Sequence, residues 1–147
     1  VWGGDNSMRS RSMALDYMEP ALRCLEEAEL AFSKEDYAGT VRRSQEALEL
    51  SSKAILRMSG IEYPREHDVS PVLEAERDRL PKSIVENLEA IIKLSSELAS
   101  LRGPAMYGYE REGIPAREAF KKDYALEVLT EVKKLVEIMR KALYDIL

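Results

Sequence analysis

The chain has 147 residues, enough for one domain, and its composition of 45% hydrophobic and 33% charged residues is that of a soluble globular protein. Its 22 basic and 27 acidic residues give a net charge of −5, which argues against coating nucleic acid through bulk positive charge. The single cysteine, Cys24, excludes an intramolecular disulfide, and the single histidine, His67, excludes histidine clusters, so we expect no metal and no other cofactor.

Residues 1–11 precede the first helical pattern, which Met13 begins. They lack the apolar segment of a signal peptide, and nowhere does the chain reach about 18 uninterrupted apolar residues, the length of a membrane span. We interpret residues 1–11 as a cloning scar or a flexible lead-in, and residues 12–147 as a single helical-bundle domain. A lone cysteine without an export signal favours a cytoplasmic location.

A first helix is predicted up to about residue 33. Its apolar residues recur every three or four positions and so share one face: Met18, Ala21, Leu25, Ala28 and Phe32. Pro20 suits a first helical turn, so this helix either begins near Pro20 or runs from about residue 12 with a kink.

A second helix is predicted over residues 36–58. Val41, Leu48 and Ile55 lie seven residues apart and would form its buried stripe, and Gly60 stands where a helix-ending glycine belongs. Because only a short break at 33–36 separates the two helices, they should form an antiparallel hairpin.

The remaining helices are predicted over residues 71–78, 82–102 and 123–147. Ser70 would cap the first of them, with Pro71 in its first turn. Gly103 and Pro104 would stop the second, so that residues 103–120 form a long polar loop. Loops of this length inside a compact bundle are often functional.

The predicted fold class is therefore all-α, an up-down bundle of four long helices plus a short one. The last helix is apolar beyond a single stripe, since Leu135 and Ile138 flank its main face, and Val85 and Ile92 similarly broaden the helix at 82–102. A helix that faces only its own core needs a narrower apolar face, so we expect a homodimer.

The residues best suited to bind a ligand follow the helix at 82–102. Arg102 would stand at the carboxyl end of that helix, and Tyr107, Tyr109 and Arg111 would follow in the loop. Arginine offers a planar fork of donors for phosphate, and tyrosine rings can stack on bases. We expect these side chains to line a cleft, because the surrounding glycines and prolines would let the loop fold back. The alternative is that Arg102 caps its own helix while the tyrosines cover the end of the bundle.

His67 is predicted to be structural, together with Ser70. The imidazole precedes the short helix by a few residues and would pack or cap there. A single histidine without a cysteine, serine or second histidine beside it has no obvious nucleophile to activate, which weighs against a catalytic role.

Three stretches of the sequence together resemble a HEPN domain, a small helical family named for nucleotide binding in higher eukaryotes and prokaryotes. They are residues 28–37, residues 44–69 with Gly60, Pro64 and His67, and residues 102–109. The resemblance implies an up-down bundle of four or five helices that usually dimerises, in agreement with the periodicity.

The resemblance also implies a site. Many family members are RNases or toxins with the motif Arg-x(4–6)-His, and Arg102 matches its arginine, but Tyr107 stands in the place of the histidine. In one branch the motif continues to a tyrosine to which a partner nucleotidyltransferase attaches AMP, and Tyr109 matches that position. A tyrosine hydroxyl, with an ordinary pKa near 10, is a poor general base at neutral pH, where imidazole is well matched.

Our first hypothesis is accordingly a HEPN-like nucleotide- or RNA-associated binding and regulatory protein. It would lack the catalytic histidine, form a homodimer and act with a minimal nucleotidyltransferase, using Arg102, Tyr107, Tyr109 and Arg111 to bind nucleotide. The alternatives are a metal-independent RNase toxin of a toxin–antitoxin pair, with Arg102 and Tyr107 as candidate catalytic residues beside Tyr109, and a structural bundle without a ligand.

Overall fold

The computed structural model describes residues 3–146, and the side chains of residues 11–146. This part of the chain is all-α, as predicted. Its helices, in chain order, are α1 (Gly3–Ser33), α2 (Tyr37–Met58), α3 (Ser70–Ala75), α4 (Lys82–Glu86), α5 (Leu88–Ser100), α6 (Arg102–Tyr107), α7 (Ala116–Ala119) and α8 (Lys122–Ile146), with the short 3-10 turns Arg77–Arg79 and Glu110–Glu112. None of the helices in this described part has the length and apolar character that crossing a membrane requires.

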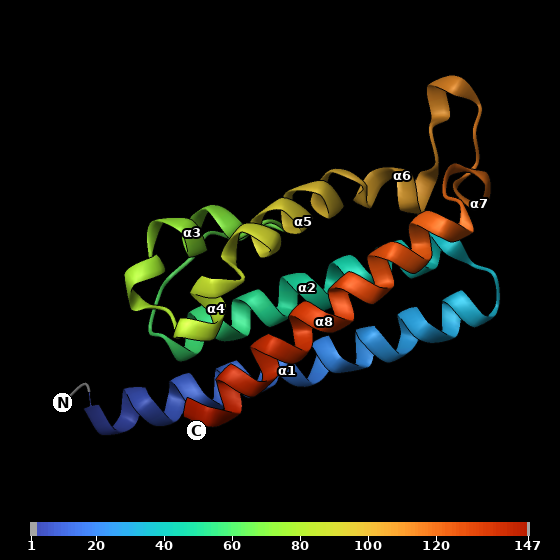
Figure 1. The fold of residues 1–147 in the computed structure, drawn as a ribbon. Helices are drawn as coiled ribbons and strands as arrows, with labels where there is room; N and C mark the ends of the chain where they lie inside the picture. Colours follow the sequence, from blue (N-terminus) through green and yellow to red (C-terminus); the bar gives the residue numbers. More distant parts are fainter. Residues whose placement is uncertain (1–2, 147) are drawn as a thin grey trace.

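The hairpin of α1 and α2 is confirmed, and the two helices lie antiparallel and side by side (Figure 1). Asp36 caps α2 by accepting a hydrogen bond from the Gly39 backbone N–H at 2.9 Å. Helix α1 continues through Pro20, so the alternative of a helix beginning at Pro20 is wrong. The backbone of residues 3–11, which the sequence assigned to a lead-in, continues α1, and residues 1–2 lie outside the described residues.

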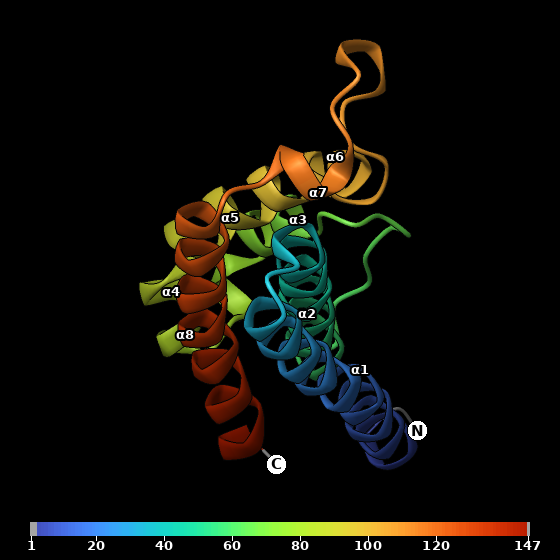
Figure 2. The same cartoon turned by 90° about the vertical axis from the view of Figure 1, so that its right-hand side faces the viewer.

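Helix α2 lies at the centre of the bundle. It packs against α1 on one side and α8 on another, and α5 and α6 cross above it (Figure 2). Its predicted stripe is confirmed, since Val41, Leu48 and Ile55 are each almost wholly buried. Because α2 contacts most of the other helices, side chains along it lie beside segments that are distant in sequence.

The predicted helix over 82–102 is broken twice. Asn87 donates from its side-chain amide to the Ser83 carbonyl four residues earlier, and side-chain bonding of this kind competes with regular helix geometry. The chain breaks again at Leu101, and residues 102–107 form α6, although residues 103–107 were predicted as loop. Pro104 is compatible with α6 because it lies in the first turn, where a backbone N–H has no helical partner.

The part of the predicted loop after α6 is a hairpin that projects from the bundle (Figure 1). Tyr109 and Ile114 exchange two backbone hydrogen bonds, of 2.8 and 3.0 Å, across its base. Gly108 has a φ of +73°, and a side chain there would collide with the Ile114 carbonyl, so glycine is required. The loop therefore points away from the bundle instead of folding back.

The broad apolar faces that suggested a homodimer are partly used within the chain. Leu135 is buried in the core of its own bundle, and Val85, Ile92 and Ile138 remain half-buried at its edge. The homodimer stays a prediction, with a smaller apolar surface to support it than the sequence suggested.

Candidate functional site

Arg102 lies at the first position of α6, directly after α5, and its side chain turns back onto α2. Its Nη1 donates to the Gln45 Oε1 at 2.5 Å and lies 3.9 Å from the Glu49 Oε1. The side chain is 29% exposed, and Gln45 is buried. Helix α6 and helix α2 together therefore fix the guanidinium at the edge of the bundle.

The polar face of α2 receives this arginine. Gln45, Glu49 and Lys53 are spaced four residues apart and so stand above one another on one face. The Gln45 amide donates to the Glu49 Oε1 at 2.9 Å, and the Lys53 Nζ lies 2.8 Å from the Glu49 Oε2. Glu49, 11% exposed, is thus the central acceptor of the cluster.

His67 joins the same cluster from the segment 61–69. Its Nδ1 lies 3.1 Å from the Glu49 Oε1, and 59% of its side chain is exposed. The start of α3 is held by a different residue, because Asp68 accepts hydrogen bonds from both the backbone N–H and the hydroxyl of Ser70. Ser70 was predicted to cap α3 but is its first residue. His67 contacts α2 and not the start of α3.

Around this cluster runs a cleft of two adjoining hollows, which we call the polar cleft. One hollow, of about 290 Å³, is lined by Glu46, Glu49, Leu50, His67 and Arg102. The other, of about 460 Å³, is lined by Tyr17, Glu49, Lys53, Tyr63, Arg65, Glu66 and His67. Glu49 and His67 border both hollows, so Arg102 and the two tyrosines lie at opposite ends of one cleft.

Aromatic rings form the far end of the polar cleft. Tyr17 meets Tyr63 edge-on, with ring centroids 6.4 Å apart. The Lys53 Nζ lies 5.9 Å and the Arg57 guanidinium 5.7 Å from the centroid of Tyr63, within cation–π range. Burial raises the pKa of the Tyr63 hydroxyl, so this ring is neutral at physiological pH. The cleft thus combines cationic donors with apolar ring surface.

The structure does not bring the predicted loop residues to Arg102. Tyr107 is 65% and Tyr109 37% exposed, and both lie with Arg111 on or next to the projecting hairpin. No hydrogen bond within the described part of the chain joins Arg102 to any of the three. Their ligand-binding role stays a prediction.

Sequence reasoning missed Gln45, Glu49 and Lys53 as site residues. Their four-residue spacing on a helix that is otherwise buried was a readable signal. The contact of His67 had no such signal, because it depends on the path of segment 61–69 across α2.

Among the described residues, no three His, Cys, Asp or Glu side chains lie close enough together to bind a metal ion. Cys24 lies 3.6 Å from the Glu46 Oε2, and burial, aided by this carboxylate, raises the pKa of its thiol to about 11. A thiol that stays protonated at neutral pH is a poor nucleophile and metal ligand.

Comparison with known families identifies the chain. The model of the HEPN domain matches residues 14–142, and since this is nearly the whole chain, the protein belongs to the HEPN domain family. Searches of curated proteins and of solved structures give no match.

Proposed function

We propose that this HEPN-domain protein is a binding and regulatory module that takes a nucleotide or an RNA phosphate into the polar cleft without cleaving it. The observation that carries the proposal is the convergence of Arg102, Lys53 and His67 on the single carboxylate of Glu49. The three side chains come from α6, α2 and the segment 61–69, so packing and not the ligand brings them together.

Arg102 is the group best suited to hold the phosphate. One of its nitrogens is used by Gln45, and the others keep N–H donors that can bind phosphate oxygens. Water competes with a phosphate less strongly for a half-buried guanidinium than for an exposed one. At the other end of the cleft, Tyr17 and Tyr63 offer ring surface on which a base can pack.

The binding should be weak. The carboxylates of Glu46, Glu49 and Glu66 border the same cleft and oppose a phosphate, so the cations there are nearly balanced. We expect about 4–6 kcal/mol of binding free energy, a Kd of roughly tens of micromolar to 1 mM. Such an affinity suits a regulatory module that responds to abundant nucleotide.

Isothermal titration with AMP, ATP and a short RNA tests the proposal. Arg102→Ala should weaken binding about tenfold, the effect of losing one charge-assisted pair. Arg140→Ala is the matched control, because Arg140 also pairs with a carboxylate, that of Glu137, but lies on α8. Equal binding by the Arg102→Ala variant and the wild type would refute the site.

A second candidate function, RNA cleavage, is favoured by one observation, the Glu49 carboxylate 3.1 Å from the His67 Nδ1. This contact selects the tautomer that is protonated at Nδ1 and leaves Nε2 as an acceptor. The Nε2 of His67 would take the proton of an RNA 2′-hydroxyl while the 2′-oxygen attacks the phosphorus. The bond to the 5′-oxygen would break, and the proton would pass to that oxygen, giving a 2′,3′-cyclic phosphate and a 5′-hydroxyl.

Cleavage of a labelled RNA without metal separates the two candidates. If the protein is a binding module, no product accumulates with any variant. If it is an RNase, His67→Gln should abolish the cyclic product at unchanged melting temperature, whereas loss on Tyr107→Phe would support the tyrosine named by the sequence motif.

The partner proposal concerns Tyr109. Two backbone hydrogen bonds to Ile114 fix this residue at the base of the projecting hairpin, and its side chain is exposed. A hydroxyl presented in this way is accessible to a minimal nucleotidyltransferase that transfers AMP. Incubation with such an enzyme and ATP should add the mass of one adenylyl group to the wild type and none to Tyr109→Phe.

The homodimer is tested by light scattering. We expect a mass twice the 16.7 kDa of the chain at micromolar concentration, and a monomer when Ile92 and Ile138 are both changed to glutamate, because charge on a half-buried apolar edge prevents its burial. A monomeric wild type would contradict the assembly.

A further inference from the structure

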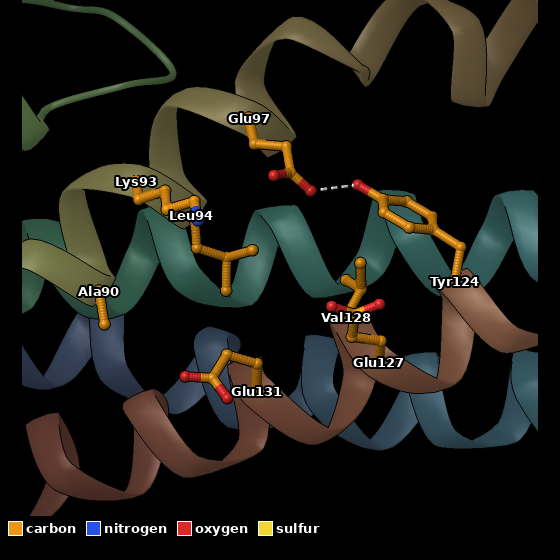
Figure 3. Close-up of a pocket in the computed structure, with 8 residues that line it drawn as sticks. All are labelled: Ala90, Lys93, Leu94, Glu97, Tyr124, Glu127, Val128 and Glu131. Carbon is orange, nitrogen blue, oxygen red and sulfur yellow. Dashed lines mark hydrogen bonds between the residues drawn. The ribbon is translucent and has the colours of Figure 1, made fainter.

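A second hollow of the molecule lies between α5 and α8, away from the polar cleft. It is a groove of about 320 Å³ lined by Ala90, Lys93, Leu94, Glu97, Tyr124, Glu127, Val128 and Glu131, shown in Figure 3. Ala90, Leu94 and Val128 form an apolar floor, and Glu97 closes one end by accepting a hydrogen bond from the Tyr124 hydroxyl at 2.5 Å. We call it the α5–α8 groove.

The rim of this groove is acidic. Glu97, Glu127 and Glu131 face a single cation, Lys93. Elsewhere on α8 some charges are paired, as Lys133 is with Glu29 at 3.5 Å and Arg140 with Glu137 at 2.7 Å. Among the side chains that the structure describes, Glu127 and Glu131 have no such pair. The groove therefore combines an accessible apolar floor with two carboxylates that have no ion pair among the described side chains.

The dimensions of the groove match one face of a helix. Its walls extend over eight residues on each helix, from Ala90 to Glu97 and from Tyr124 to Glu131, which is about 10 Å from first to last at the rise of an α-helix. This is the length of two helical turns, the span between apolar side chains at positions i, i+4 and i+7 of an amphipathic helix.

From these observations we infer that the α5–α8 groove docks a basic amphipathic helix of a partner protein. Its apolar side chains would occupy the floor of Ala90, Leu94 and Val128, and its lysines or arginines would pair with Glu127 and Glu131. Charge complementarity selects this occupant, because an acidic or neutral helix would leave both carboxylates unpaired beside a covering surface.

Fluorescence anisotropy with two labelled synthetic helices tests the inference. One helix carries leucine on one face flanked by lysine, and the other has glutamate in place of every lysine. The wild-type protein should bind the lysine helix and not the glutamate helix. The double variant Glu127→Lys/Glu131→Lys should weaken binding of the lysine helix at least about tenfold through the reversed charges. Leu94→Asp should also weaken binding, although it makes the net charge of the protein more negative and not more positive.

The control is the double variant Glu110→Lys/Glu112→Lys, which makes the same change in net charge on the projecting hairpin. It should leave binding unchanged. Equal weakening by the two double variants would show that only the net charge of the protein matters and would overturn the inference. Failure of the wild-type protein to bind the lysine helix would overturn it as well. Binding of spermidine in place of the helix would assign the groove to a small polyamine, and conversion of a dimer to a monomer by Glu127→Lys/Glu131→Lys would assign it to a second copy; either result overturns it.

Discussion

The polar cleft and the α5–α8 groove are two hollows of one small bundle that use charge in opposite ways. In the cleft, Glu49 contacts Gln45, Lys53 and His67 and has Arg102 close by, so its charge is consumed within the fold. In the groove, Glu127 and Glu131 are free of ion pairs among the described side chains. Paired charges hold side chains in place, whereas unpaired charges are available to a partner. The net charge of −5 for the whole chain does not reveal this difference between the two regions.

The largest difference should appear in stability. Glu49→Leu removes the acceptor shared by the α2 cluster and leaves a half-buried lysine without its pair, so it should cost about 2–4 kcal/mol of unfolding free energy. Glu127→Leu, a matched change in the groove, should stay within about 0.5 kcal/mol. Urea denaturation of both variants measures the contrast, and equal costs would show that the cleft carboxylate is not structural.

Alkaline pH should weaken the region behind the polar cleft. Cys24, beside Glu46, has its thiol pKa raised from 9.0 to about 11 in the folded protein. The neutral thiol is the form that folding favours, so its contribution is fully present below pH 9 and is lost as the pH rises to 11. We expect a loss of about 1–2 kcal/mol across that window.

The measurement for Cys24 is the difference between the wild type and Cys24→Ala, because lysines and tyrosines titrate in the same range. The unfolding free energies of the two proteins should converge as the pH rises. A constant difference from pH 8 to 11 would mean that the thiol does not titrate between the folded and unfolded states.

Salt should separate the two hollows by ligand affinity. Exposed charges are screened within a Debye length of about 8 Å at physiological ionic strength, and partly buried ones are screened less. Raising salt from about 50 to 500 mM should therefore weaken the lysine helix at the groove about tenfold and AMP at the cleft about threefold. A steeper salt dependence for AMP would reverse the comparison.

The smallest effect is expected from Tyr124→Phe. This change removes one partly exposed hydrogen bond to Glu97, so it should cost only about 0.5–1 kcal/mol. It also frees a third carboxylate on the groove rim, and binding of the lysine helix should strengthen slightly while AMP binding stays the same. Anisotropy and titration on one preparation measure both, and weaker helix binding would show that the bond holds the groove open.

How much the sequence could predict differs between fold and site. The stripe of Val41, Leu48 and Ile55 predicted α2 correctly because burial on one helix face is a local pattern. The break at Leu101 carried no sequence signal, since leucine favours helices, and α6 was taken for loop because Gly103 and Pro104 were interpreted as a helix stop. Tertiary packing decided that position.

For the candidate site, the sequence indicated Arg102 but not its surroundings. Its Gln45 partner lies 57 residues away, and His67 reaches Glu49 across 18 residues. Contacts over such separations depend on how elements pack, which a single sequence does not encode in its spacing. Tyr107 was grouped with Arg102 because both match the family motif and the loop was expected to fold back, yet α6 directs them to different surroundings.

The tight turn between α1 and α2 bears on how quickly the chain finds its fold. Only residues 34–36 separate α1 from α2, so closing the hairpin costs little chain entropy. Helix α2 is then in place for the later helices that pack against it. Proteins dominated by such local contacts fold in microseconds to milliseconds. Glu35, at a φ of +62°, is the one residue in this turn that resists the geometry. We therefore expect Glu35→Gly to accelerate refolding more than it changes the rate of unfolding.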